Sequence, residues 1–253
     1  MAHLDNTVAL ITGASSGIGA ATASALATQG SAVVLVARRT ARIAELATKI
    51  RADGGTALAL TADITRSEDA REIVSTTVRE LGRLDILVNN AGTMLLGPAV
   101  DTPLDEWERM VQLNLLGLMY CTHAALPHLL SAAAESPRQV ADLVNVSSVA
   151  GRFPRGGSSG YNATKFGVTG FSEAIRQEVT KRHVRVSVVE PGAVDTELVS
   201  HNRPGIQERH AQRFADVRKM AAADIADTIA FILTRPWYTS VNEVVLRPTE
   251  QEN

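Results

Sequence analysis

The sequence predicts a doubly wound α/β domain in which a seven-stranded parallel sheet carries helices on both faces. Short apolar segments alternate with longer segments of helical periodicity from one end of the chain to the other. Most of the short segments are apolar throughout instead of alternating, which is typical of strands that are covered on both faces. Such strand–helix alternation implies right-handed crossovers between parallel strands.

Each expected strand is a short run rich in Val, Leu, Ile and Ala, and each expected helix is a longer run with helical periodicity. In chain order, the expected elements are strand 8–12, helix 18–29, strand 32–36, helix 41–53, strand 57–61, helix 67–81, strand 86–89, helix 104–132, strand 142–146, helix 159–183, strand 185–190, helix 223–233 and strand 243–246. No composition break or fixed-period repeat divides the chain, so we expect residues 1–253 to form one domain.

The alternation is interrupted after the sixth strand, over residues 193–220. This segment is polar and contains Pro204 and Gly205, so we expect irregular chain there. An irregular segment of this length inside a compact domain is more often a functional lid than a simple connection. The sequence therefore predicts a substrate lid at about residues 193–220.

The composition indicates an ordinary globular protein. Hydrophobic residues make up 45% of the chain, and the formal net charge is −2. Nucleic-acid-binding domains usually carry a strongly basic surface, so we expect no nucleic-acid partner. The histidines show no metal-ligand spacing and there is no Cys/His cluster, so we expect no metal.

The chain start and the single cysteine favour a cytoplasmic protein. The first residues, which include His3 and Asp5, do not form a basic segment followed by an apolar one, so we expect no signal peptide. Apolar stretches stay shorter than a membrane span, so we expect no membrane partner. Cys121 excludes an internal disulfide and suits a reducing compartment, and its apolar neighbours predict a buried thiol.

A glycine-rich turn directly follows the first expected strand and opens the first expected helix. Its glycines allow a sharp turn and a close approach to a pyrophosphate, while the helix N-terminus offers free N–H groups. The G-x-x-x-G-x-G spacing differs from the common G-x-G-x-x-G fingerprint, and a tight turn without a ligand is the alternative. The position of the turn favours a dinucleotide site formed by Gly13, Ser15, Ser16, Gly17, Ile18 and Gly19.

The end of the second expected strand indicates which dinucleotide binds. NAD-dependent sites usually place an acidic residue there to bind the ribose 2′-hydroxyl, and this chain has Ala37 instead. Arg38 and Arg39 follow, and arginines form charge-assisted hydrogen bonds with a 2′-phosphate. The alternative is that both arginines are solvated at a helix start. We therefore expect NADP(H), with NAD(H) as the second choice.

Tyr161 and Lys165 lie four residues apart in an expected helix, on one face and one turn apart. A nearby ammonium favours the phenolate and lowers the pKa of a tyrosine, which makes it a better acid/base near neutral pH. Most such pairs are ordinary surface neighbours, so the pair alone is weak. Its setting strengthens it, because Ser148, residues 89–92 and Pro191–Gly192 follow three strands whose carboxyl ends share one edge of the sheet.

Together these residues resemble the short-chain dehydrogenase/reductase family along essentially the whole chain. The resemblance implies a Rossmann-like fold and hydride transfer between a nicotinamide cofactor and an alcohol or carbonyl carbon. It implies that Ser148 stabilises the substrate oxygen, that Tyr161 exchanges its proton, and that Lys165 lowers the pKa of Tyr161 and binds the nicotinamide ribose. Asn114 would hold a water that relays protons outward.

The resemblance also extends the expected cofactor site. Asp63 would contact the adenine, and Thr196 would contact the nicotinamide end. The further residues that it implies for cofactor binding are Ile64, Asn89, Ala91, Gly92, Pro191, Gly192 and Val194, together with Tyr161 and Lys165. Residues 94–98, 114–120, 125–130 and 247–249 are similar to those of clavulanic acid dehydrogenase-like NADPH-dependent reductases, which indicates a subfamily but no substrate.

Three questions stay open from the sequence. A non-catalytic protein that senses NADP(H) would keep the glycine turn but would not need Ser148, Tyr161, Lys165 and Asn114 together. Arg152 and Arg155, before Tyr161, either attract acidic substrates or are solvated loop residues. The family pairs its long helices between subunits, so the resemblance implies a homotetramer, or else a dimer.

Overall fold

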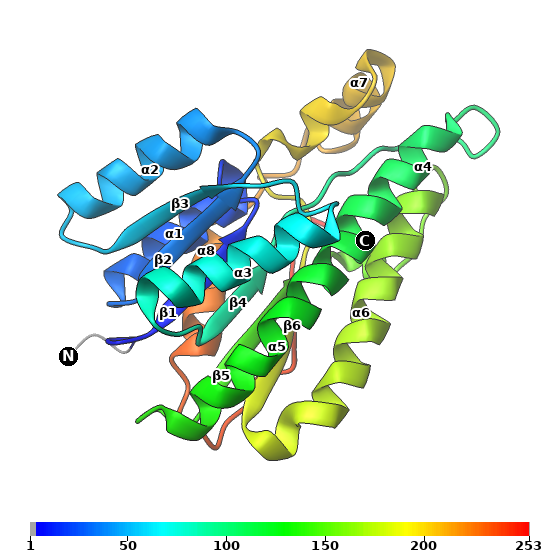
Figure 1. The fold of residues 1–253 in the computed structure, drawn as a ribbon. Helices are drawn as coiled ribbons and strands as arrows, with labels where there is room; N and C mark the ends of the chain where they lie inside the picture. Colours follow the sequence, from blue (N-terminus) through cyan, green and yellow to red (C-terminus); the bar gives the residue numbers. More distant parts are fainter. Residues whose placement is uncertain (1–3, 253) are drawn as a thin grey trace.

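The computed structural model describes residues 4–252 and has the predicted architecture, a parallel sheet between two helical layers (Figure 1). The strands are β1 (Val8–Thr12), β2 (Ala32–Ala37), β3 (Ala57–Thr61), β4 (Ile86–Asn89), β5 (Ala141–Val146), β6 (Val184–Pro191) and β7 (Glu243–Leu246). Their order in the sheet is β3-β2-β1-β4-β5-β6-β7. In β1, Ile11 pairs with Leu35 of β2 and with Val88 of β4. Because the strand order reverses between β1 and β4, a crevice opens there at the carboxyl edge of the sheet.

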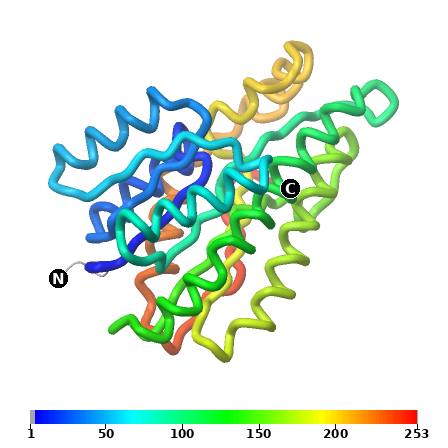
Figure 2. Tube along the Cα trace, in the orientation of Figure 1, coloured from blue at the N-terminus to red at the C-terminus, as the bar shows by residue number. Residues whose placement is uncertain are grey.

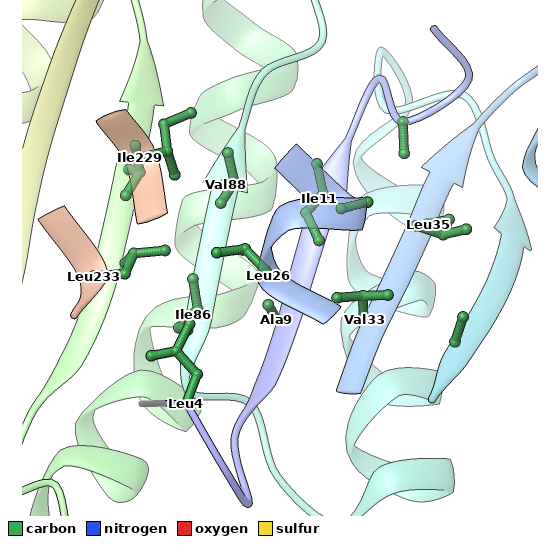
Figure 3. Packing of buried hydrophobic residues seen from close by; sticks show 14 of the residues in the cluster. Leu4, Ala9, Ile11, Leu26, Val33, Leu35, Ile86, Val88, Ile229 and Leu233 are labelled. Atoms are coloured by element: carbon green, nitrogen blue, oxygen red, sulfur yellow. The ribbon is translucent and has the colours of Figure 1, made fainter. Parts of the chain in front are cut away.

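One face of the sheet is covered by α1 (Gly17–Thr28), α2 (Thr40–Ala52) and α8 (Ala222–Leu233). Figure 3 shows Leu26 of α1 with Ile229 and Leu233 of α8 beside the strand side chains of this layer. All three are fully buried. Full burial of a Leu or Ile side chain stabilises a fold by about 1.5–3 kcal/mol, so these contacts anchor both helices beneath the cleft.

The opposite face is covered by α3 (Ser67–Leu81), α5 (Leu118–Glu135) and α6 (Ser159–Val179). Cys121 of α5 is fully buried in this layer, as the sequence predicted. Burial raises the pKa of its thiol to about 12, so the thiol stays protonated at neutral pH. Among residues 4–252, no helix combines the length and the apolar character that a membrane crossing requires.

The expected helix 104–132 is three consecutive helical segments. They are α4 (Leu104–Met110), a π-helical segment η1 (Val111–Gly117) and α5, which continues to Glu135. A π turn holds one residue more than an α turn and is often found at functional sites. Within η1, Asn114 bonds the backbone of Thr93, and Gly117 packs against the Ile64 carbonyl. Sequence periodicity cannot show this feature, because the flanking segments are ordinary α-helix.

The expectation of irregular chain over residues 193–220 is wrong. A 3-10 turn η4 (Glu197–His201) and a helix α7 (Pro204–Arg213) lie within it. Pro204 is the first residue of α7, where a proline costs no hydrogen bond. Only Ile206 is buried in α7, so the helix has almost no apolar stripe to reveal it. Figure 2 shows this segment beyond the sheet, on the same side as the loop before α4.

Two further 3-10 turns complete the fold. They are η2 (Val149–Gly151), between β5 and α6, and η3 (Thr180–Arg182), which replaces the last turn of the expected helix 159–183. His183 has a φ of 60°, in the left-handed region, and ends that segment. The turn η2 is the more consequential, because it leads from the end of β5 into the loop before Tyr161.

Candidate active site

A cleft of about 420 Å³ follows the crevice at the carboxyl ends of the strands. Loops after β1, β2, β3, β4, β5 and β6 contribute to it, as does the segment 193–220. The predicted site residues that line it are Gly13, Ser15, Ser16, Gly17, Ile18, Arg38, Arg39, Asp63, Ile64, Ala91, Gly92, Ser148, Tyr161, Lys165, Pro191, Gly192, Val194 and Thr196. The structure thus brings nearly all of them to one place.

The glycine turn has a shape that only glycine permits. Gly13 has a φ of 68°, and a Cβ there would lie 2.8 Å from the Ala91 Cα. A Cβ at Gly19 would lie 2.4 Å from the Gly13 carbonyl oxygen. Ser16 precedes α1, and its side chain does not cap the helix. The turn therefore leaves an uncrowded cradle in front of an uncapped helix N-terminus, which fits a pyrophosphate.

Three predicted residues, Gly19, Asn89 and Asn114, do not line the cleft. Gly19 gives the turn room to close. Asn89 is buried and donates to Thr122 Oγ1 at 3.0 Å and to Asn145 Oδ1 at 2.9 Å, so it joins β4 to its neighbours. The neighbouring Asn90, which belongs to the predicted range 89–92 but was not among the expected cofactor ligands, does line the cleft and donates to the Thr12 carbonyl.

The side-chain amide of Asn114 forms three hydrogen bonds within the protein. Its Oδ1 accepts from the Thr93 backbone N–H at 2.8 Å, and its Nδ2 donates to the Thr93 carbonyl at 2.8 Å and to Thr164 Oγ1 at 3.2 Å. Thr93 follows β4, and Thr164 precedes Lys165 on α6. The side chain of Asn114 thus ties the loop after β4 to the helix that carries Tyr161 and Lys165.

The end of the cleft next to β2 is rich in arginine. Arg39 donates from Nε to Ser15 Oγ at 3.0 Å and from Nη2 to Ser16 Oγ at 2.6 Å. Arg38 is exposed, and its Nη1 lies 3.8 Å from Asp63 Oδ2. The Arg39 side chain is therefore held by the glycine turn, whereas the Arg38 side chain is exposed at the surface of the cleft.

A carboxylate from η4 already occupies this arginine cluster. Glu197 accepts from Arg39 Nη1 at 2.7 Å and from Arg42 Nη1 at 2.5 Å. These bonds hold the pKa of Glu197 at about 2, so its side chain is ionised at any physiological pH. Sequence reasoning missed Arg42 and Glu197. Arg42 lies one helical turn after Arg38, which was an available signal, but nothing local to Glu197 indicates its partners.

Tyr161 lies on the first turn of α6, and Ser148 ends the segment after β5. Both are buried and face the same cleft. Tyr161 can sit deep because the residue before it is glycine: a Cβ at Gly160 would lie 2.6 Å from Trp107 Cδ1. Lys165, one turn later, donates from Nζ to the Val146 carbonyl at 2.9 Å, and its Nζ lies 5.7 Å from the centre of the Tyr161 ring.

The pKa of Tyr161 moves opposite to the sequence expectation. Burial raises it to about 12, and a hydrogen bond with Ser148 opposes part of that rise. Burial also lowers the pKa of Lys165 to about 8. The expected lowering of the Tyr161 pKa by Lys165 is not found, because desolvation dominates and the ammonium bonds the Val146 carbonyl. In this state the phenol is a proton donor.

The far end of the cleft, toward the loop 152–158 and the segment 193–220, was hardly predicted. Its lining includes Met94, Leu96, Phe153, Arg155, Leu198, His201, His210, Arg213 and Phe214. Arg152, in contrast, bonds Glu190 and Glu243 and does not line the cleft. Across the part of the chain that the structure describes, no three His, Cys, Asp or Glu side chains form a metal-binding group.

Comparison with protein families agrees with this geometry. Residues 7–207 match the short chain dehydrogenase family. Among curated proteins, an uncharacterized oxidoreductase of Staphylococcus saprophyticus is 35% identical over 98% of this chain and 100% of its own length. An uncharacterized oxidoreductase of Staphylococcus epidermidis is 32% identical with the same coverage of both chains.

Solved structures resemble the whole chain. A metagenomic short-chain oxidoreductase in complex with NADP has a TM-score of 0.81 and 31% identity, and the match covers 98% of this chain and 99% of that one. A serine dehydrogenase complexed with NADP+ has a TM-score of 0.88 and 28% identity over 98% and 97%. A 3-ketoacyl-(acyl-carrier-protein) reductase from Brucella melitensis complexed with NADH has a TM-score of 0.84 and 31% identity over 96% and 98%.

Proposed function

The chain belongs to the short-chain dehydrogenase family, and we propose that it is an NADP(H)-dependent oxidoreductase that interconverts a carbonyl compound and an alcohol, with Tyr161 as the acid/base. The observation that carries this proposal is the convergence of Ser148, Tyr161 and Lys165 on a cleft that begins at a glycine cradle. A protein that only senses the cofactor has no use for a buried phenol at the far end of such a cleft.

The chain's own residues fit a nicotinamide dinucleotide. The α1 N-terminus and the Gly13–Gly17 turn fit the pyrophosphate, and Lys165 is available for the ribose next to the nicotinamide. When bound, the cofactor supplies or accepts the hydride. Proposed cofactor ligands besides these are the cleft-lining residues of the loops after β3, β4 and β6, including Asp63, Ile64, Ala91, Gly92, Pro191, Gly192, Val194 and Thr196.

We assign the proton transfer to Tyr161 and the stabilisation of the substrate oxygen to Ser148. A carbonyl that receives a hydride develops negative charge on its oxygen, and a protonated phenol beside it neutralises that charge. The raised pKa of Tyr161 keeps the phenol protonated at neutral pH, which suits the reductive direction. The Ser148 hydroxyl donates to the Pro191 carbonyl at 3.3 Å. This hydrogen bond is long and therefore weak, so the hydroxyl can turn toward a substrate oxygen instead. Asn114 acts indirectly, by fixing α6 against the loop after β4.

The arginine cluster supports NADP(H) over NAD(H). Arg39 and Arg42 already hold one anionic oxygen each of Glu197, and the exposed Arg38, whose Nη1 lies 3.8 Å from Asp63 Oδ2, can approach a second anion. A 2′-phosphate is also an anion, like the Glu197 carboxylate, and it offers these arginines more oxygens than the carboxylate does. The end of β2 has no acidic residue to hold a 2′-hydroxyl, because Ala37 occupies that place.

We further propose that the enzyme assembles as a homotetramer, or else a dimer, in the cytoplasm. Exposed large apolar side chains in two parts of the fold support assembly. Leu104, Val111 and Phe166 lie on α4, η1 and α6, while Phe231, Trp237, Tyr238 and Val245 lie on or between α8 and β7. Light scattering of the purified chain tests the subunit number.

The test of the proposed function is a panel of small aldehydes, ketones and alcohols, including β-hydroxy compounds, followed through nicotinamide absorbance with NADPH and NADH side by side. Turnover of any member with NADPH, abolished in Tyr161→Phe, supports the proposal. Equal kcat/KM with NADH makes the choice of NADP(H) wrong. Tight NADPH binding with no turnover across the panel favours the sensing protein.

A further inference from the structure

The substrate end of the cleft carries positive charge, and within residues 4–252 no carboxylate forms an ion pair with its arginines. Arg155 and Arg213 line it, together with His201 and His210. Burial, with a contribution from nearby Lys219, lowers the pKa of His210, so the arginines are the permanent cations there. The acidic lining residues, Asp63 and Glu197, lie at the adenosine end and are paired with arginines.

Arg155 is the unusual member of this group. Its Nη2 is buried and has no hydrogen-bond partner, and within residues 4–252 its guanidinium has neither an ion-pair nor a ring partner. The other arginine of the same loop, Arg152, bonds Glu190 at 2.8 Å and also Glu243. A buried N–H of a charged group without an acceptor is unfavourable. The contrast indicates an acceptor for Arg155 that residues 4–252 do not supply, such as a group on a bound ligand.

The backbone fixes Arg155 relative to the reacting group. Asn162 Nδ2 donates to the Arg155 carbonyl at 3.0 Å, and the Ser158 N–H donates to the same oxygen at 3.3 Å. Asn162 is the residue after Tyr161 on α6, and both are buried. The backbone of Arg155 is therefore anchored to the turn of helix that carries the proton donor, and its side chain extends into the cleft from that fixed point.

We propose, on the basis of the function proposed above, that Arg155 is the specificity determinant of this site and that the substrate is a small oxo-acid or hydroxy-acid whose carboxylate it binds. A guanidinium offers a planar fork of donors that matches a carboxylate, and the pair gains strength in a desolvated cleft. The carbonyl or alcohol carbon of the same molecule then lies toward Tyr161. The Arg152 side chain stabilises the fold through its ion pairs, whereas the Arg155 side chain binds the substrate carboxylate.

The test compares small oxo-acids with their own methyl esters in wild type and Arg155→Gln. The acids should have the higher kcat/KM in wild type. Arg155→Gln should lower kcat/KM for the acids by roughly 10- to 100-fold, the usual effect of losing a charge-assisted hydrogen bond, and change the esters by less than about threefold. Arg155→Lys should recover part of the preference, and the Kd for NADPH should stay the same.

Two controls separate the outcomes. Arg209→Gln removes an equal charge from an exposed position of α7 that does not line the cleft, and it should leave the acid-to-ester ratio unchanged. Succinate should inhibit the reduction of a neutral aldehyde by wild type and not by Arg155→Gln. Equal loss on acids and esters, or no succinate inhibition of wild type, overturns the role of Arg155 while the oxidoreductase stands. No turnover of acids, esters or neutral carbonyls overturns the proposed function itself.

Discussion

Glu197, in the segment after β6, lies 2.7 Å from Arg39 Nη1 through its Oε2 and 2.5 Å from Arg42 Nη1 through its Oε1. Arg39 lies between β2 and α2, and Arg42 lies in α2, so the two ion pairs join this early part of the chain to the segment after β6, and Arg39 and Glu197 both line the cleft. A cofactor with a 2′-phosphate must share these arginines with Glu197 or displace it. The same contact therefore bears on cofactor affinity and on the position of the segment.

Glu197→Gln keeps the shape of the side chain but removes its charge. We expect the Kd for NADPH to fall by roughly 2- to 10-fold, because exposed ion pairs such as these are individually weak and their loss frees both arginines. NADH, which has no 2′-phosphate, should gain less. Because the pKa of Glu197 is held at about 2 and a phosphate monoester is fully ionised well above about pH 6, the effect should be the same at about pH 7.5 and about pH 9.

Fluorescence titration with both cofactors measures this effect, with Glu208→Gln on the exposed side of α7 as the matched control. Weaker NADPH binding by Glu197→Gln would show that the carboxylate holds the segment over the cofactor instead of competing with it.

Hydrogen exchange should show a lid within residues 193–220 that is shorter than the sequence suggested. The base of the segment is pinned, because the Asp195 N–H donates to the Met220 carbonyl at 2.8 Å and the Met220 N–H to the Ala193 carbonyl at 3.1 Å. We expect amides of residues 197–213 to become protected when NADPH and substrate bind, since hydride transfer requires exclusion of water. Amides of β5 serve as the unchanging reference. Slow exchange in 197–213 without any ligand would rule out a lid.

Tyr161→Phe should keep the fold and the NADPH affinity and lose activity by ~10²-fold or more, the usual range for acid/base catalysis. The ring and its packing remain, and only the hydroxyl group is removed. In wild type, alcohol oxidation should accelerate as pH rises, because it needs the phenolate and the pKa of Tyr161 is raised to about 12. Retention of more than a tenth of wild-type kcat in the variant would assign the proton to another group or to water.

Lys165→Met should change how stability depends on pH. Burial lowers the pKa of Lys165 from 10.5 to about 8, so between these values the unfolded chain binds more protons than the folded one. Wild-type stability therefore gains from this group as pH rises through that window, and the burial cost of the ammonium is present below it. Methionine has no such cost, although the bond to the Val146 carbonyl is lost.

We therefore expect the Tm of Lys165→Met, relative to wild type, to decrease from about pH 7 to about pH 9.5 in the absence of cofactor. Thermal unfolding followed by circular dichroism measures it, and Lys181→Met, at an exposed position of η3, should show no such trend. An increase of the difference with pH would mean that the ammonium stabilises the fold.

The sheet was predictable because most strands are apolar throughout, a local property of sequences such as Val8–Thr12. The glycine turn and the Tyr161–Lys165 pair were predictable for the same reason, since their residues are close in sequence. Glu197 was not, because its partners lie far away along the chain. The sequence also does not distinguish the roles of the two loop arginines, Arg152 and Arg155. Their difference depends on Glu190, which is distant in sequence and bonds Arg152.

The direction in which the pKa of Tyr161 shifts could not be predicted from the sequence, for a different reason. The spacing of Tyr161 and Lys165 places a charge near the phenol, but it does not give the depth at which both are buried. That depth depends on Gly160 against Trp107, a contact between α6 and α4. Desolvation then outweighs the neighbouring charge.

The π-helical segment η1 rotates the residues before it about the helix axis, relative to those of α5 that follow it. On an unbroken α-helix, Asn114 would share the stripe of Cys121, Ala125 and Leu129, which faces the sheet. The additional residue changes its bearing, so that its amide meets Thr93 and Thr164 instead. Deleting one residue from Val111–Gly117 would restore the α-helical phase and turn Asn114 toward the sheet. The insertion or deletion of a single residue in η1 can thus change which way Asn114 points, while the buried residues of α5 keep their places against the sheet.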